Sequence, residues 1–512
     1  MVVGQRQRHT METNFQIGKI DLRQTLASII CLAVIAFGIW EALLGWGQLL
    51  GFTPSRHSLY PATGTFFNPG PFCGFLAMIM PLAVGCVLRD GNRIMYWAGW
   101  LFILPALGIM PSLMGRTGWI AAAVGCLAVG FGSGRIRRPD MLLSMIIVMG
   151  AVVVGLFVVW LKPASAFGRL LIWRDGLSAA MISPLTGVGW HGVGGALGAA
   201  QEAYFAANPS SALAAVAGTP EYAFNEFLQI AIAFGIPAAL VFIALLVTSC
   251  VSAFRSYHFS AGGSLLAFAI VCFSSYPLQF PEFVVCAALL VISVILCDRR
   301  LFPAVSVFVG GAVAVTAFLA VRALHADSEK AQEWSRIRYA YQHSLSRRDI
   351  AALDSLSDIH RHSSRFLFDY GKALRENGLY EKSDSVLRRG LSVSSDPMFL
   401  NLLGRNSHDC HRFSEAEEMY RRSITRLPGR MYPYYLLARL HADSLCFDRY
   451  KFMMAYEAAM DMDPKVMSPA IRQMRTDLRN MHDSITALTP HHIDDYLIDD
   501  YFRPIRPFRD RR

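Results

Sequence analysis

Charged residues are scarce in the first 324 residues of this 512-residue sequence. These residues hold 11 of the 38 Asp and Glu residues and 18 of the 48 Lys and Arg residues, whereas the last 188 residues hold the other 27 and 30. A segment so poor in charge is compatible with hydrocarbon, and the last part must lie in water. Because basic and acidic residues nearly balance in that last part, it offers no strong positive field to a polyanion, and nucleic-acid binding is not expected.

The sequence also lacks the short motifs of many catalytic sites. It has no zinc-ligand spacing, no glycine-rich phosphate-binding loop and no nucleophile elbow, so neither a metal nor another cofactor is expected. Eight of the ten cysteines fall in apolar stretches and are expected to be small buried hydrophobic residues. The other two, Cys410 and Cys446, lie in the charged part and are candidates for pairing in an oxidising compartment.

Long apolar runs dominate what is present. A membrane-spanning helix needs about 20 mostly apolar residues, because all of its backbone polar groups must be satisfied internally. The first run is long enough to stay as an anchor, so no cleaved signal peptide is expected. Nine runs are candidate spans, at about residues 25–50, 71–88, 94–111, 117–133, 141–161, 227–252, 262–278, 283–297 and 302–322.

We therefore expect an all-α fold with a polytopic transmembrane bundle over residues 25–324. The two runs that flank Pro277 and Pro281 are also compatible with a re-entrant hairpin. With the N-terminal residues 1–24 inside, 12 of the 18 basic residues of this part fall in cytoplasmic segments, as the positive-inside rule favours. Nine spans then place the C-terminal part outside, together with a long segment at 162–226, and loops of such length are usually functional when they are ordered.

The charged C-terminal part repeats itself. Two stretches match with Tyr380 over Phe413 and Leu387 over Tyr420, at a spacing of 33 residues. A third copy follows 36 residues further on, at Tyr456. Aromatic and small residues at this spacing resemble a degenerate tetratricopeptide array.

We therefore expect an α-helical, tetratricopeptide-like solenoid over residues 325–490, followed by a basic tail at 491–512. Such a solenoid either binds a protein partner on its concave surface or only caps the membrane domain, and the sequence favours neither.

Three of the arginines on the predicted external side are candidates for binding an anion. Arg116 begins the fourth span, and Arg169 and Arg174 lie in the long external segment. If that segment is helical, Arg169 shares a face with Trp173, and Arg174 lies one residue further round. Guanidinium groups bind a diphosphate bidentately. The alternative is structural: Arg116 anchors a span at the membrane interface, and Arg174 contacts a lipid headgroup or pairs with Asp175 on the surface.

Four groups of motifs in order carry a resemblance to a known family. They resemble the O-antigen ligase and polymerase superfamily, which includes some protein O-oligosaccharyltransferases, over about residues 60–250. The motifs are Gly64-Thr-Phe-Phe-Asn68-Pro, Gly115-Arg116-Thr-Gly-Trp119, Gly168-Arg169-Leu-Leu-Ile-Trp173 with Ser183-Pro-Leu-Thr-Gly-Val-Gly-Trp190, and Ala223-Phe-Asn-Glu-Phe-Leu-Gln229 with Phe234-Gly-Ile236.

The resemblance implies transfer of a glycan from an undecaprenyl-diphosphate carrier to a lipid, glycan or protein acceptor. It implies that the reaction needs no metal and takes place at the periplasmic face of a bacterial inner membrane. Arg116 and Arg169, and less directly Arg174, are the residues it implies for holding the diphosphate. We expect the residues that bind substrate to include Asn68, Trp173, Glu221 and Asn225.

Two positions depart from the family pattern. Gly115 replaces a serine, and Phe224 replaces the histidine that is proposed as the base for the acceptor. Glu226, Glu221 and His191 remain as candidates to take the proton of the acceptor hydroxyl. Glu226 is equally suited to the start of a helix, and a single loop histidine is often structural. The arginines are therefore expected to supply most of the catalysis.

Two other classes of function are weighed against a transferase. A transporter of lipid-linked glycans would carry ionisable residues inside its spans, and Glu41 is almost the only acidic residue there. A membrane-tethered scaffold that recruits partners through the repeats would not need nine spans and a long ordered loop. Within the transferase class, the sequence does not distinguish a polysaccharide ligase, a polymerase and a protein O-oligosaccharyltransferase.

Overall fold

The computed structural model describes residues 22–89, 92–113, 115–136, 163–298, 347–463 and 467–488. Within these ranges the regular elements are all helices, which confirms the expected all-α class. The chain divides into two compact units, residues 1–143 with 242–323 and residues 144–241 with 324–512. The predicted spans at 141–161 and 302–322, most of the N-terminal segment and the basic tail lie outside the described residues.

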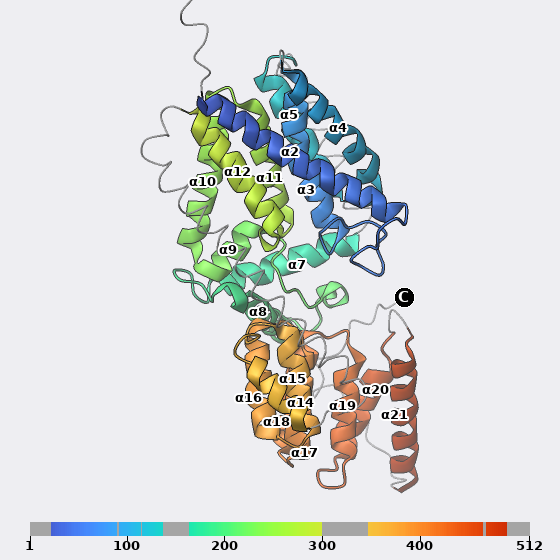
Figure 1. Ribbon diagram of the computed structural model, residues 1–512. Helices are drawn as coiled ribbons and strands as arrows, with labels where there is room; N and C mark the ends of the chain where they lie inside the picture. The colour runs from blue at the N-terminus through green and yellow to red at the C-terminus, as the bar shows by residue number, and fades with distance from the viewer. Residues whose placement is uncertain are drawn as a thin grey trace, which may run out of the picture. The chain divides into compact units, whose positions relative to one another are not determined.

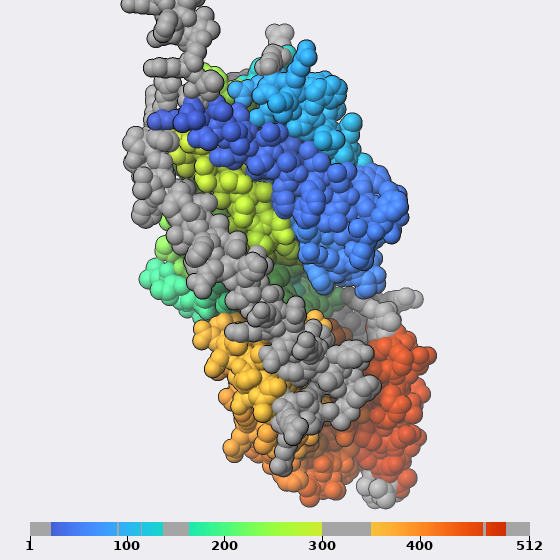
Figure 2. Space-filling model, in the orientation of Figure 1, coloured from blue at the N-terminus to red at the C-terminus, as the bar shows by residue number. Residues whose placement is uncertain are grey.

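The first unit is a bundle of apolar helices around α3 (Figure 1). Helix α3 packs against α2, α4, α5 and α11, and most of its side chains are buried. Helix α2, dark blue in Figure 2, instead exposes apolar side chains such as Ile29, Trp40 and Leu43. The elements are α2 (Leu22–Leu49), α3 (Pro69–Leu88), α4 (Arg93–Ile109), η1 (Met110–Leu113), α5 (Arg116–Gly132), α10 (Ile236–Arg255), α11 (Phe259–Ser274), η4 (Pro277–Gln279) and α12 (Pro281–Cys297).

Among the described residues, four helices are long and apolar enough to cross a membrane, judged by length and composition: α2, α3, α4 with η1, and α10. Three of the other predicted spans correspond to the shorter apolar helices α5, α11 and α12. This agrees with a membrane protein.

The predicted span at 227–252 is wrong as one continuous helix. The chain forms α9 (Glu226–Phe234), turns at Gly235 with a φ of +91°, and only then begins α10. A Cβ atom on Gly235 would lie 2.3 Å from the carbonyl oxygen of Leu185, so only glycine fits this turn. The apolar character of the sequence continues across the turn, and hydropathy therefore cannot reveal it.

The first motif, around Gly64, is a tight turn held by two buried side chains of α2. The side chain of Gln48 accepts hydrogen bonds from the backbone N–H groups of Thr63 and Gly64, both at 2.8 Å, and donates to the Gly64 carbonyl at 2.9 Å. Glu41 accepts from the N–H of Thr65 at 3.1 Å. These contacts satisfy backbone groups that the apolar surroundings cannot.

Replacement of Gly64 by alanine is expected to destabilise the first unit. Gly64 has a φ of +58°, and a Cβ atom there would lie 2.6 Å from Oε2 of Glu41, so the variant combines backbone strain with overpacking. Together these cost about 2–5 kcal/mol. Gly51→Ala is the matched control, because Gly51 also has a positive φ but its Cβ position is open. Thermal unfolding of the detergent-purified protein should show a clearly larger decrease for Gly64→Ala; equal decreases would contradict the role of the Glu41 contact.

The second unit combines the long segment before α10 with the C-terminal helices. That segment is ordered and largely helical, and α8 packs against α16 and α18. The elements are α7 (Pro163–Ala180), η2 (Trp190–Gly192), α8 (Val193–Ala207), η3 (Ala212–Val216), α9, α14 (Arg347–Leu356), α15 (Ser364–Glu376), α16 (Tyr380–Val393), α17 (Met398–Asp409), α18 (Phe413–Arg426), α19 (Met431–Ala442), α20 (Arg449–Met460) and α21 (Pro469–Leu488).

The 33-residue spacing of the sequence is a spacing of helix pairs. Helices α15 and α16, α17 and α18, and α19 and α20 pack as successive pairs, and α16 and α18 begin at the matched residues Tyr380 and Phe413. The same contact recurs inside two pairs. A Cβ atom on Gly371 would lie 2.5 Å from Leu387, and one on Gly404 would lie 2.5 Å from Tyr420. Cys410 and Cys446, the candidates for a disulfide, are both free.

Candidate functional site

Helices α7 and α9 bring the third and fourth motifs together. Residues 163–180 form one helix, so Arg169 and Trp173 share a face, as predicted. The two helices pack closely because Gly176 has no side chain: a Cβ atom there would lie 2.6 Å from Leu228 of α9. The indole N–H of Trp173 donates to the carbonyl oxygen of Phe224 at 3.4 Å. Trp173 is therefore anchored to the residues that precede α9.

The start of α9 explains why its motif contains Asn and Gln. The side chain of Asn225 caps the helix by accepting from the N–H of Leu228 at 3.1 Å, and Gln229 accepts from the N–H of Ala223 at 2.9 Å. Phe224, which precedes Asn225, has a φ of +50°, a conformation that a bulky residue rarely adopts. Asn68, which was also expected to bind substrate, caps α3 in the same way through Gly70.

Arg174 is held in place while its side chain stays accessible. Its guanidinium carbon lies 3.4 Å from the centre of the Tyr204 ring on α8. Its Nη1 lies 3.3 Å from Oδ1 of Asp175, and the side chain is 45% exposed. A cation–π contact on one side and a carboxylate on the other orient the guanidinium without burying it.

Asp175 is a residue that the sequence did not single out as functional. The predicted pair of Arg174 with Asp175 is present, but it is not a surface pair on both sides, because Asp175 is only 1% exposed. Burial raises the pKa of Asp175 from its ordinary value of 3.8 to about 6, and the nearby charge of Arg174 opposes this rise. Among the described residues its Oδ2 has no hydrogen-bond partner. A carboxyl group with this pKa is suited to accept a proton near neutral pH.

The other predicted residues are distributed more widely. Glu226 is the first residue of α9 and fully buried, as the helix-start alternative predicts, whereas Glu221 is exposed. His191 stacks on the ring of His362 with centroids 4.3 Å apart. The turn before it bonds to the C-terminal end of α9, so His191 and Glu226 are separated by this helix, about 13 Å long. Arg116 begins α5 in the first unit.

A carboxylate pair in the first unit also escaped the sequence analysis. Oγ1 of Thr65 lies 2.5 Å from Oε1 of Glu41 and 3.2 Å from Oε1 of Glu282. A hydroxyl has a single proton to donate, so both contacts are hydrogen bonds only when one carboxyl group carries a proton. The pair is a candidate proton-holding group beside the first motif. The residues are more than 200 positions apart, so no sequence signal connects them.

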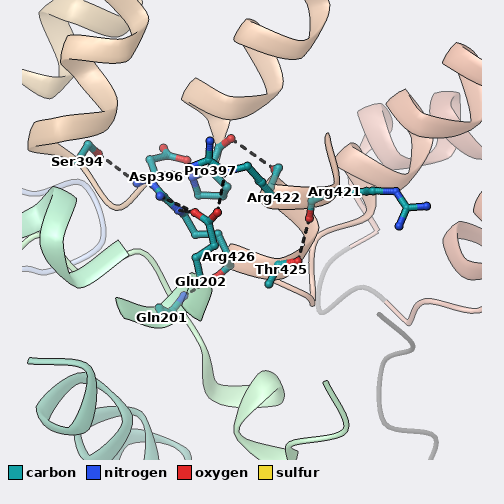
Figure 3. A network of polar contacts seen from close by, with 10 residues as sticks. Gln201, Glu202, Ser394, Asp396, Pro397, Arg421, Arg422, Thr425 and Arg426 are labelled. Atoms are coloured by element: carbon teal, nitrogen blue, oxygen red, sulfur yellow. Dashed lines mark hydrogen bonds and ion pairs between the residues drawn. The ribbon is translucent and has the colours of Figure 1, made fainter. Parts of the chain in front are cut away.

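Two features bind α8 to the C-terminal helices. The first is an ion pair with a buried arginine (Figure 3). Glu202 accepts from Nε of Arg422 at 2.7 Å and from Nη2 and Nε of Arg426 at 2.7 and 3.1 Å. Arg426 is only 2% exposed, and its carbonyl oxygen accepts from Gln201 at 2.6 Å. The long segment and the C-terminal helices are thus joined by hydrogen bonds and ion pairs between buried or partly buried polar groups.

The second feature is a row of glycines on α8. Cβ atoms on Gly194, Gly195 and Gly198 would lie 2.1–2.7 Å from backbone atoms of residues 392–395. Side chains at these positions would force the helices apart. This glycine-rich stretch is therefore the contact face of a helix.

Glu202→Gln is expected to destabilise the second unit by about 3–5 kcal/mol, because it leaves the buried guanidinium of Arg426 without its counter-charge. Glu415→Gln is the matched control: Glu415 pairs with the exposed Arg388 and Arg412, and such surface pairs contribute about 1 kcal/mol or less. The measurement is thermal unfolding of both purified variants. Similar unfolding midpoints for the two variants would show that the ion pair of Glu202 does not stabilise the second unit.

The raised pKa of Asp175 predicts a pH-dependent stability. The folded state binds this proton more tightly than the unfolded state, so the contribution of Asp175 becomes unfavourable as the pH rises from about 4 through about 6. A difference of about two in pKa corresponds to about 3 kcal/mol. Asp175→Asn should therefore gain stability relative to the wild type above pH 6, with a difference that disappears towards pH 4. Asp483→Asn, which changes an exposed carboxyl group, should follow the wild type at every pH.

Residues 100–243 match the family model described as O-antigen ligase. This segment contains Arg116 and all of α7, α8 and α9, and it excludes the motif around Gly64 and the C-terminal helices. The comparison with curated proteins gives no match. The family match supports a function of the ligase or polymerase type on lipid-linked glycans.

Proposed function

We propose that this protein transfers a glycan from an undecaprenyl-diphosphate carrier to an acceptor, as a polysaccharide ligase or polymerase at the periplasmic face of a bacterial inner membrane. The observation that carries the proposal is the position of Arg169 and Arg174 on α7. This helix packs beside the start of α9, inside the segment that matches the O-antigen ligase family. The exposed guanidinium of Arg174 is oriented by Tyr204 and Asp175, as a binding group for an anion requires.

The proposed reaction is a direct displacement. The acceptor oxygen bonds to the anomeric carbon of the lipid-linked sugar while the bond from that carbon to the diphosphate oxygen breaks. The diphosphate keeps the electron pair and remains on the lipid. Arg169 and Arg174 would stabilise its growing negative charge, and no metal takes part. For Arg116, which lies in the first unit, the same role stays a prediction from the sequence.

The acceptor proton needs a destination, because Phe224 occupies the position of the expected histidine. Asp175 has the pKa of a suitable base and lies beside Arg174. Glu226, Glu221 and His191 remain alternatives, and the separation of His191 from the start of α9 makes it the weakest of them. Trp173 and Asn225 would contribute by holding α7 and α9 in register.

We further propose that the C-terminal helices are a tetratricopeptide-like array. The 33-residue spacing, the paired helices and the repeated glycine contact at Gly371 and Gly404 support this assignment. In the proposed orientation the array lies in the periplasm, where a glycan or protein acceptor would meet it.

Arg169→Ala and Arg174→Ala are expected to lower product formation by at least about a hundredfold while the protein stays in the membrane, because each removes a charge that faces the leaving diphosphate. These variants and Arg116→Ala are expressed in a strain that lacks the gene. Their surface polysaccharide and glycoproteins are compared with those of the wild type. Arg479→Ala, an exposed arginine on α21, is the matched control.

Shorter polysaccharide chains in the deletion strain would identify a polymerase, and loss of all attached chains a ligase. A shift in protein mobility would identify a protein O-oligosaccharyltransferase. Unchanged glycoconjugates in the arginine variants would overturn the proposal.

A further inference from the structure

A charged cavity of about 270 Å³ lies among the C-terminal helices, outside the segment that matches the ligase family. Its walls come from α15, α17 and α19, which are the first helices of three successive pairs, and its floor from α18. The residues that matter are Arg375, Arg405, Arg439, Asp409, Asp443 and Tyr420. Three helix pairs thus contribute to one site, as in the concave surface of a helical repeat protein.

The cavity has more positive than negative charge, and the positive charge is not neutralised internally. Asp409 pairs with Arg375, and Oδ2 of Asp443 lies 3.0 Å from Nε2 of His408. Arg405 and Arg439 have no acidic partner among the described residues. Two unpaired guanidinium groups at one small cavity favour an anionic ligand.

Tyr420 supplies a second observation that points to a ligand. It is fully buried, lines the cavity, and its hydroxyl has no hydrogen-bond partner within the described residues. An unsatisfied buried hydroxyl costs stability, so packing does not explain it. In the preceding pair, Leu387 makes the equivalent contact with a glycine without any hydroxyl. The tyrosine hydroxyl therefore adds something that the fold does not require, and burial raises its pKa, which keeps it a donor.

The size and composition of the cavity restrict the ligand. Its volume is below the roughly 300–1,000 Å³ of sites for drug-sized molecules, so it accepts one small residue. The carboxylate oxygens of Asp409 and Asp443 in its walls can accept hydrogen bonds from hydroxyl groups, and a phosphate dianion has no proton to donate to them. Nη1 of Arg405 lies 3.5 Å from the hydroxyl of Tyr432, and the guanidinium carbon of Arg439 lies 5.8 Å from the centre of the Tyr435 ring, so these two tyrosines help to position the arginines. A small ligand with one negative charge and several hydroxyl groups fits these features.

We propose that this cavity binds a sugar residue that carries a carboxylate, as part of a glycan. Arg405 and Arg439 hold the carboxylate, Tyr420 donates a hydrogen bond, and the aspartates accept from the sugar hydroxyls. The assignment to a glycan rests on the proposed function, whereas the preference for a small monoanion rests on the cavity alone. The cavity would be a second binding site for the glycan of the transferase, remote in sequence from the arginines proposed to bind the diphosphate.

The test is calorimetric titration of the purified full-length protein with D-glucuronate, compared with D-glucose, inorganic phosphate and an acidic dipeptide. Glucuronate should bind at least about tenfold more tightly than glucose, because hydrogen bonds to a charged group contribute about 1.5–3 kcal/mol. The double variant Arg405→Gln/Arg439→Gln should lose this preference. Tyr420→Phe, which keeps the ring packed against Gly404 and removes only the hydroxyl, should weaken binding about fivefold. Arg479→Gln, an exposed position on α21, should bind as the wild type does.

Equal binding of glucuronate and glucose, tighter binding of phosphate or of the dipeptide, or unchanged binding in the double variant would each overturn the inference. The titration needs no transferase activity, so the two proposals fail separately. If glucuronate does not bind but Arg169→Ala abolishes the product, the inference falls and the proposed function stands. If glucuronate binds and Arg169→Ala leaves product formation unchanged, the inference stands and the proposed function falls.

Discussion

The ion pair between Glu202 and the buried Arg426 is the contact on which the second unit depends. It fixes α8, whose glycines lie directly against the backbone of the C-terminal helices. Helix α8 in turn carries Tyr204, the ring beneath the guanidinium of Arg174. Separating a buried charge from its partner costs several kcal/mol, so this ion pair restricts the movement of α8 relative to α18. The C-terminal helices are thereby part of the framework that orients Arg174, and they are more than an appended binding module.

The motifs that resemble a ligase family divide into residues that build turns and residues that face outward. Gly64, Asn68, Asn225 and Gln229 satisfy backbone groups or remove steric conflict at helix starts and turns. Arg174, which directly follows the α7 motif, has an accessible side chain. Such a division is expected of a site in which tight turns hold short helices and the charged groups remain free to meet a substrate.

The helix pairs show how a repeat acquires a specific site. Two of the pairs, α15 with α16 and α17 with α18, share a packing rule in which a glycine of the first helix receives a large residue of the second. Changing that residue from leucine to tyrosine keeps the packing and adds a hydroxyl to a cavity whose walls come from three pairs. A repeated scaffold can thus change its ligand by substitutions at equivalent positions, without any change of the backbone.

The sequence by itself determined the all-helical class, the apolar and charged parts, the 33-residue spacing and the helical face shared by Arg169 and Trp173. Each of these follows from local composition or periodicity. Only the tertiary structure decided that the apolar run at 227–252 breaks at Gly235, that Asp175 is buried, and that Glu41 and Glu282 share Thr65. Burial and long-range pairing depend on which helices meet, and an apolar run has the same hydropathy whether it continues straight or turns back on a glycine.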